Sequence, residues 1–254
     1  MPILYLRQLT TSQRSRKADR HLAGFLAFIA GAINAGGFLA FQRYTSHMTG
    51  IVSSIADNFA LGELPSVLGG IVAVLSFVAG AAVSAILINW ARRHGLRSQY
   101  ALPLMLEAGL LLCFGLLGGN LDSHRWLFLP ATVWLLCFVM GLQNAMITKL
   151  SKAEIRTTHI TGMVTDIGIE IGKLLYWNGR RRKDASEPMV MAERAKLALL
   201  AALTSLFLIG GVVGALGFKH LGFIATLPLA ALLVLLAVVP IVDDVLTRIR
   251  NEER

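Results

Sequence analysis

The hexapeptide TSHMTG at residues 45–50 has a close copy, TTHITG, at residues 157–162. Each copy follows an apolar run that holds a related pentapeptide, GAINA at 31–35 and GLQNA at 141–145. The spacing from the pentapeptide glycine to the hexapeptide histidine is 16 residues in the first half and 18 in the second. Two motifs in the same order at nearly the same spacing indicate an internal duplication. A duplication is considered before any other pattern, because it determines how the chain divides into structural units.

Small residues extend the duplication downstream of the hexapeptides. Gly80 and Ser84 lie four residues apart in one apolar run, as Gly210 and Gly214 do in another. Such pairs allow two membrane helices to approach closely. We therefore expect each repeated unit to hold three membrane helices and one hexapeptide.

The composition is that of a membrane protein. Hydrophobic residues make up 55% of the 254 positions and charged residues only 15%, whereas soluble domains average about 25% charged residues. The predicted class is an all-α membrane protein embedded in the lipid bilayer, with six transmembrane helices of the length that a crossing needs. They are predicted at Ala23–Phe41, Val67–Trp90, Ala101–Gly118, Trp126–Thr148, Leu197–Phe218 and Leu221–Val242.

The distribution of basic residues orients these helices. Of the 24 Lys and Arg residues, 21 lie in the N-terminal segment, in the links after helices 2 and 4, and in the C-terminal tail. Basic residues accumulate on the cytoplasmic side, so both termini are predicted to be cytoplasmic. The net charge of +9 then reflects topology, and nucleic acid is not an expected partner.

Two further apolar segments, 48–61 and 160–175, follow the hexapeptides. If both crossed the membrane, the basic residues would divide about 16 to 8, a much poorer separation. We therefore interpret these segments as re-entrant or surface-lying helices, or as interrupted extensions of helices 1 and 4.

Three crossings in each unit invert the second unit relative to the first, as in many secondary transporters. We expect two inverted three-helix repeats. The predicted organisation is a basic segment at 1–22, a first repeat at 23–118, a second repeat at 119–243 with a long basic cytoplasmic link at 149–196, and a cytoplasmic tail at 244–254.

The hexapeptides hold the first candidate residues. In the six-helix topology the first copy lies toward the outside and the second toward the cytoplasm. Thr or Ser before a helix is a good N-cap, so each copy is explained equally well as a polar turn at the membrane boundary. Alternatively the turns line a polar cavity, because irregular backbone at membrane depth is tolerated only where it is buried or lines water. The candidates for a substrate pathway are His47, Thr49, Gly50, His159, Thr161 and Gly162.

Two asparagines within the apolar runs are further candidates. Asn34 and Asn144 hold matching positions in the two pentapeptides. A buried amide in a membrane needs a partner. Each residue therefore forms either an interhelical hydrogen bond or part of a pathway lining.

Glu107 is the lone ionisable residue within a predicted span. Carboxyl groups at membrane depth are typical of functional sites such as proton relays. The alternative is a structural ion pair with the basic link at 92–97. Because LPL at 102–104 aligns with LPL at 227–229, the counterpart of Glu107 in the second half is near Leu232.

Acidic residues downstream of the hexapeptides are secondary candidates. Asp166 and Glu170 share a helical face after the second copy, and Asp57 follows the first copy. A solvated cytoplasmic helix accounts for Asp166 and Glu170 without a functional role.

Catalytic signatures are missing from the sequence. It has no HExxH motif, nucleophile elbow or P-loop. Cys113 and Cys137 lie in apolar runs without metal-ligand spacing. We therefore expect neither a cofactor nor a metal, and we do not expect an enzyme; only the two histidines favour a lipid-modifying one.

The basic amino end, HMTG after the first helix and NAMITKLSKAEIRTTHITG at 144–162 resemble the YoaK-like family of bacterial inner-membrane proteins. The resemblance extends over about residues 20–245. It implies six helices and a bacterial inner-membrane location, and no activity, since the family's function is unknown. WARRHGLRS at 90–98 is also similar to a turn of major-facilitator transporters, which implies that two copies pair to enclose a pathway.

The expected function is transport of a small solute along a polar pathway between the repeats, with a homodimer as the expected assembly. The alternative is a membrane-embedded binding or regulatory subunit whose basic link at 149–196 engages a partner or anionic lipid. The sequence alone does not separate the two.

Overall fold

The computed structural model describes residues 16–41, 44–96, 98–120, 125–150, 160–176 and 189–252. Within these ranges all regular structure is helical, which confirms the all-α prediction. The elements are α2 (Arg16–Phe41), α3 (Met48–Ala60), α4 (Leu64–Arg93), α5 (Ala101–Gly119), α6 (Arg125–Leu150), α7 (Ile160–Leu175), α8 (Arg194–Leu221), the 3₁₀ turn η1 (Gly222–Ala225) and α9 (Thr226–Glu252).

Five helical segments are long and apolar enough to cross a membrane, so the chain is a multi-pass membrane protein. They are Ala18–Leu39, Leu64–Arg93, Ala101–Gly119, Phe128–Lys149 and Arg194–Leu246. The last segment runs over 53 residues and contains α8, η1 and most of α9. By contrast, α3 has 13 residues and α7 has 16, fewer than the roughly 20 that a crossing needs.

The ends of α4 show how the sequence sets the limits of a helix. Pro65 lies in the first turn, where a missing N–H removes no helical hydrogen bond. Arg92 and Arg93 lie in the last turn, where positive charge complements the helix dipole. The chain then turns away at Gly95, whose φ of 67° is readily adopted by glycine.

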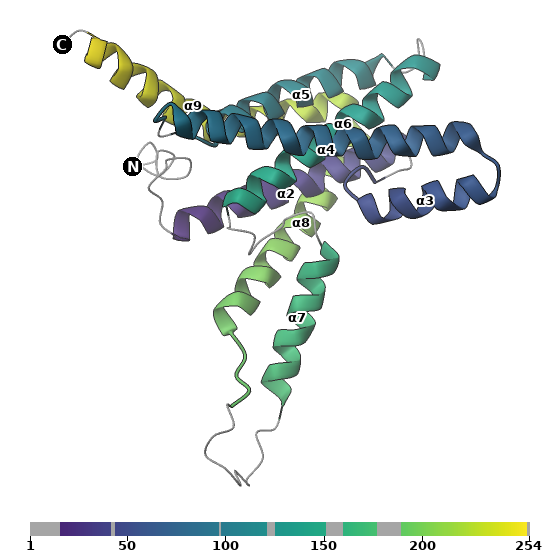
Figure 1. Ribbon diagram of the computed structural model, residues 1–254, viewed down its shortest axis with the longest axis horizontal. Coiled ribbons are helices and arrows are strands. Elements are labelled where there is room, and N and C mark those ends of the chain that lie inside the picture. The colour runs from purple at the N-terminus through teal and green to yellow at the C-terminus, as the bar shows by residue number, and fades with distance from the viewer. Residues whose placement is uncertain are drawn as a thin grey trace.

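Two helix pairs form the centre of the bundle, α2 with α8 and α4 with α6, and α5 packs against α9 (Figure 1). Glycines set the approach of α2 to α8. A Cβ at Gly31 would overlap the carbonyl oxygen of Phe207, and a Cβ at Gly210 would overlap that of Phe28. Backbones this close gain the van der Waals contact that holds membrane helices together.

The α4–α6 pair meets in the same way. A Cβ at Gly80 would overlap the carbonyl oxygen of Phe138, and a Cβ at Gly141 would overlap that of Phe77. Gly80, which the sequence analysis singled out as part of a small-residue pair, is thus a point of closest helix approach.

The two short helices pack back along their successors, α3 beside α4 and α7 beside α8. In Figure 1, α7 and the first part of α8 project from the rest of the bundle as an arm; we call these segments the α7–α8 arm. No residue of α3 is buried, and its Phe59 is 70% exposed. Apolar surface of this kind on a short helix fits contact with lipid.

Candidate functional site

A cavity of about 980 Å³ lies where four long helices meet the starts of α3 and α7. Its volume is at the upper end of the usual range for small-molecule sites. The lining comes from α2, the turn before α3, and α3, α4, α6, α7 and α8. The lining residues are Asn34, Tyr44, Ser46, His47, Met48, Thr49, Phe77, Ala81, Asn144, Ala145, Thr148, Lys149, Ile160, Thr161 and Phe207.

The cavity collects predicted residues from both halves of the sequence. Asn34 and Asn144 both line it, as do His47, Thr49 and Thr161. Although the six-helix topology places the two hexapeptides toward opposite faces, residues from both copies line this one cavity. His159, which the same prediction included, lies outside the described residues.

The N-cap interpretation of the first hexapeptide is wrong. α3 begins after His47, whose side chain forms no capping hydrogen bond and lines the cavity instead. Gly50 makes room for this arrangement, because a Cβ at Gly50 would overlap Nδ1 of the His47 ring. Gly50 therefore supports a lining residue without being one, and Gly162, in the first turn of α7, is not a lining residue either.

The turn before α3 is tied to α2 by a polar contact. The hydroxyl of Ser46 donates a hydrogen bond to Oδ1 of Asn34 at 2.8 Å. Asn34 is thus hydrogen-bonded and lines the cavity, but its partner lies in a turn and not in a second helix. A role in a substrate pathway stays a prediction. The contact fixes where α3 starts relative to the cavity.

Lys149 lines the cavity, although the sequence analysis assigned it to the cytoplasmic link. α6 continues to Leu150, so Lys149 lies in its last turn. Its Nζ donates to the carbonyl oxygen of Ala85 at 3.3 Å and to Oδ1 of Asn89 at 3.1 Å. Both acceptors are neutral, and no carboxylate of the described residues pairs with this ammonium group.

Glu107 lies in the core of the bundle and does not line the cavity. Its Oε1 accepts a hydrogen bond from Nε2 of Gln143 at 2.9 Å, and this amide also lies 3.3 Å from the carbonyl oxygen of Leu26. Both side chains are fully buried, and Oε2 of Glu107 has no hydrogen-bond partner among the described residues. The partner is therefore a neutral amide, and the ion pair that we considered with the 92–97 link is not observed within the described part of that link.

Gln143 was missed at the sequence level, although a signal was present. It is the middle residue of GLQNA, where the first copy, GAINA, has Ile33. Leu232 likewise stands near the position that matches Glu107. The buried polar pair thus joins the two halves, since Glu107 lies in the first repeat and Gln143 in the second, and each has an apolar counterpart in the other repeat. Gln143 directly precedes the lining residue Asn144.

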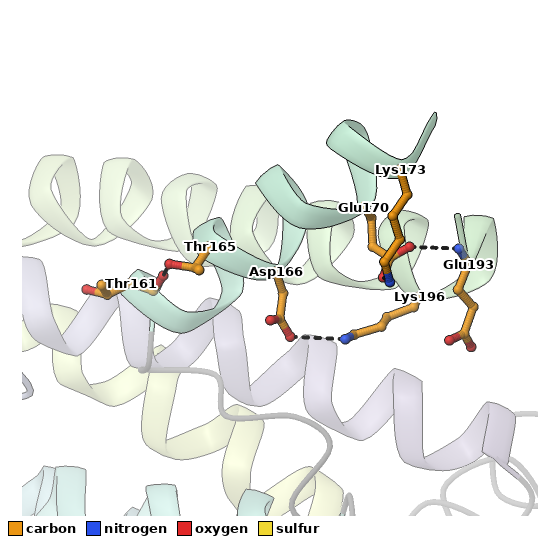
Figure 2. Close-up of polar contacts among 7 residues, drawn as sticks. All are labelled: Thr161, Thr165, Asp166, Glu170, Lys173, Glu193 and Lys196. Atoms are coloured by element: carbon orange, nitrogen blue, oxygen red, sulfur yellow. Dashed lines mark hydrogen bonds and ion pairs between the residues drawn. The ribbon is translucent and has the colours of Figure 1, made fainter. Parts of the chain in front are cut away.

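The acidic residues of α7 anchor this helix to the start of α8 (Figure 2). Asp166 pairs with Lys196 at 3.2 Å. Glu170 accepts a hydrogen bond from Lys173 at 2.8 Å and one from the backbone N–H of Glu193 at 2.7 Å. These hydrogen bonds, that from Lys173 first, hold the pKa of Glu170 below its ordinary value of 4.5. We call these contacts between α7 and the start of α8 the clasp. They are structural contacts, and neither Asp166 nor Glu170 lines the cavity.

The remaining candidate is Asp57, which is exposed on α3 and does not line the cavity. Within the described ranges no three His, Cys, Asp or Glu residues are grouped so that they would hold a metal ion. The functional groups that the described lining residues present are amides, hydroxyls, one imidazole and one ammonium group.

A family model described as a protein of unknown function, DUF1275, matches residues 22–239. The chain belongs to the DUF1275 family. It is also 24% identical over 214 residues to the UPF0700 transmembrane protein YoaK of Bacillus subtilis (strain 168), an alignment that covers 82% of this chain and 88% of YoaK. No solved structure matches.

These comparisons confirm the predicted YoaK-like relationship. The match to the DUF1275 model covers the cavity residues of both halves. Because the family description and the name of YoaK give no activity, a function for this chain has to be argued from the cavity itself.

Proposed function

We propose that this chain is a transporter that carries a small solute through the cavity, between two inverted three-helix repeats. The observation that carries the proposal is that matching residues of the two halves line one cavity. The matched pairs are Asn34 with Asn144, Met48 with Ile160, Thr49 with Thr161, and Phe77 with Phe207. Secondary transporters bind their substrates where inverted repeats meet.

The helix contacts support the same repeat. Gly31 on α2 meets the Phe207 carbonyl on α8, and the matching Gly141 on α6 meets the Phe77 carbonyl on α4. Exchanging the two halves converts one contact into the other. This is the relation expected of a pseudo-two-fold axis that passes between the α2–α8 and α4–α6 pairs.

The places where α3 and α7 start also favour transport. α3 starts at the residue after His47, and α7 starts at the residue after His159. Both starts line the cavity. Discontinuous helices at membrane depth are tolerated where they line a cavity, and in transporters they form substrate sites.

Six crossings require α8 and α9 to span the membrane separately. The apolar segment Arg194–Leu246 has 53 residues, about 80 Å as a straight helix at 1.5 Å per residue, far longer than a hydrocarbon core of about 30 Å. The turn η1 and the φ of 59° at Gly222 interrupt it. These features and the basic residues support six crossings with both termini cytoplasmic, in a bacterial inner membrane.

Single-cysteine labelling tests the topology, after Cys113 and Cys137 are replaced by alanine. We place cysteines at His94, between α4 and α5, and at Asn120, after α5; both positions are exposed. A membrane-impermeant maleimide should modify position 94 from the cytoplasmic side and position 120 from the other side. Labelling of both from one side would contradict six crossings.

Transport is tested with cysteines at Thr49 and Thr161 in the same background, reconstituted in oriented proteoliposomes. A cavity that opens alternately to the two sides should be labelled from both. Uptake from a defined mixture of sugars, amino acids and organic acids is measured by mass spectrometry against empty liposomes. Cavity labelling from one side only, with no uptake above empty liposomes, would overturn the proposal.

The described lining of the cavity comes from one chain. The homodimer remains a prediction, and the mass of the complex in native membrane nanodiscs tests it. A monomer that retains uptake would remove the dimer from the proposal and leave the pathway intact.

A binding or regulatory subunit is the second candidate, and one observation favours it. The α7–α8 arm projects from the bundle (Figure 1), where a partner protein or lipid head groups would reach it. Six of the ten basic residues of this link, at 151–159 and 177–188, lie outside the described residues. Replacing the four basic residues at 180–183 with glutamine distinguishes the functions: lost partner or lipid binding with intact uptake would assign the link to binding and the cavity to transport.

A further inference from the structure

The described lining of the cavity carries a net positive charge. Among the described lining residues Lys149 is the one with a formal charge at neutral pH, and these residues include no Asp or Glu. Two neutral acceptors hold the ammonium group, and no carboxylate of the described residues neutralises its charge.

The ammonium is placed for a ligand at one end of the cavity. It is held against Ala85 and Asn89 on α4, one to two turns beyond the lining residue Ala81. Side-chain entropy normally disfavours fixing a lysine without an ionic partner. An anionic group that entered the cavity would complete the contacts of this side chain, because three donors are present on Nζ and two are used.

The backbone adds a positive electrostatic potential to the cavity. α3, with 13 residues, and α7, with 16, both present their N-terminal turns to the cavity. The N-terminal end of a helix carries partial positive charge and unpaired N–H groups. These two helix starts would therefore strengthen binding of an anion whose main contact is Lys149, and would disfavour a cation.

The apolar part of the lining does not favour a bare inorganic ion. Phe77 and Phe207 come from opposite helix pairs, and Met48 and Ile160 add aliphatic surface. An ion that lost its water against such surface would be poorly compensated. A ligand with an apolar body fits this part of the cavity, with one charged group directed at the ammonium.

We infer that the cavity binds a small organic monoanion, a carboxylate on an apolar body, with its charge paired to Lys149 and its body against Phe77 and Phe207. This inference rests on the proposed function, because it names the substrate class of the same site. The counterpart of Lys149 in the first half is near Leu39, so the charge marks one end of an otherwise matched cavity.

The test uses probes that differ in charge and hardly in shape. Benzoate, benzamide and benzamidinium, and the aliphatic pair hexanoate and hexanamide, are titrated against the purified full-length protein. Binding is measured as protection of a cysteine at Thr49 from maleimide, with Cys113 and Cys137 replaced by alanine. Each carboxylate should bind about tenfold more tightly than its amide, since a hydrogen bond to a charged group adds roughly that factor.

Variants assign the preference to one side chain. Lys149→Gln should remove the preference for carboxylate, and Lys149→Arg should retain most of it. Lys219→Gln, at an exposed lysine outside the cavity, is the matched control and should change nothing. Thermal midpoints and monodispersity in gel filtration show that each variant is folded.

The outcomes separate this inference from the transport proposal. A preference for benzamide or benzamidinium, a carboxylate preference that survives Lys149→Gln, or no binding of any carboxylate would overturn the inference. Uptake of neutral solutes alone would support the transport proposal and contradict the proposed substrate class. Protection by carboxylates without uptake would support the proposed ligand class and contradict the transport proposal.

Discussion

The bundle around the cavity and the α7–α8 arm hold their helices together by different means. In the bundle, glycines such as Gly31 and Gly80 bring backbones into contact, and the buried Glu107 meets a neutral amide. In the arm, Glu170 and Asp166 meet lysines. Helices in lipid associate through close packing and neutral hydrogen bonds, whereas ion pairs are usual where water or head groups are near.

The two buried glutamates make this difference concrete. Glu170 has a lysine and a backbone N–H for its two oxygens, which is sufficient for an ionised carboxylate. Glu107 has one amide for one oxygen and none for the other. The contacts of Glu170 therefore account for it as a structural residue. Glu107 has fewer contacts among the described residues than an ionised structural carboxylate needs. Our hypothesis is that Glu107 has a role in proton coupling.

The largest expected effect is at a glycine of the bundle. Gly80→Ala should destabilise the protein by about 3 kcal/mol, the upper end of the range for overpacking, because the added Cβ would overlap a backbone carbonyl oxygen that has no rotamer to change. Gly69→Ala in the same helix meets nothing within 4 Å and should be neutral or stabilising by up to about 1 kcal/mol. Thermal unfolding in one detergent compares them, and equal effects would contradict the packing.

The next effect concerns Glu107. Glu107→Ala should lower stability by about 2–3 kcal/mol, since it leaves a cavity and removes the acceptor of Gln143. Glu107→Gln keeps the shape and a carbonyl acceptor, so its stability should be close to that of the wild type. If Glu107 couples transport to protons, uptake by the Glu107→Gln variant should no longer respond to an imposed pH gradient. An unchanged response would exclude the coupling role.

The all-α membrane class was predictable from the sequence, because helix formation in a membrane depends mainly on local composition. The matched motifs pointed to Asn34, Asn144, Thr49 and Thr161, which line the cavity. Their role in a substrate pathway stays a prediction. The number of crossings and the inverted relation of the halves stay predictions.

Other features were not predictable because they depend on partners distant in the chain. The sequence predicted Lys149 as a basic residue of the cytoplasmic link. Its contacts with Ala85 and Asn89 on α4 place it in the cavity instead. Gln143 differs from its counterpart Ile33 in the duplicated pentapeptide, but only the fold brings it to Glu107, 36 residues earlier in the sequence. Phe77 and Phe207 lie three residues before paired glycines, a signal that aligning the two halves more fully would have revealed.

A smaller effect, on pH dependence, is expected from Glu170. Because hydrogen bonds lower its pKa in the folded state, its stabilising contribution is present above the ordinary value and is lost as pH falls through the folded value. The thermal midpoint of the wild type should therefore drop as pH falls below about 4.5. Glu170→Gln should start several degrees lower at neutral pH and lose less on acidification.

The control is Glu63→Gln, at an exposed glutamate whose side chain forms no capping hydrogen bond. This variant should follow the wild-type curve throughout the pH series. If Glu170→Gln also followed the wild-type curve, the clasp between α7 and α8 would not contribute to stability, and the contrast with Glu107 would lose its basis.

The smallest effect is expected at the pair of Asp166 and Lys196. Their side chains are 42% and 40% exposed and 3.2 Å apart, so a double-mutant cycle with Asp166→Asn and Lys196→Met should give a coupling of about 0.2–1 kcal/mol, as for other exposed pairs. That coupling should fall as salt is added, because exposed charges are screened. A coupling well above 1 kcal/mol that resists salt would mean that the arm lies in a low-dielectric surrounding. The arm would then belong with the bundle, in contact with lipid, and the clasp would be a membrane-embedded contact.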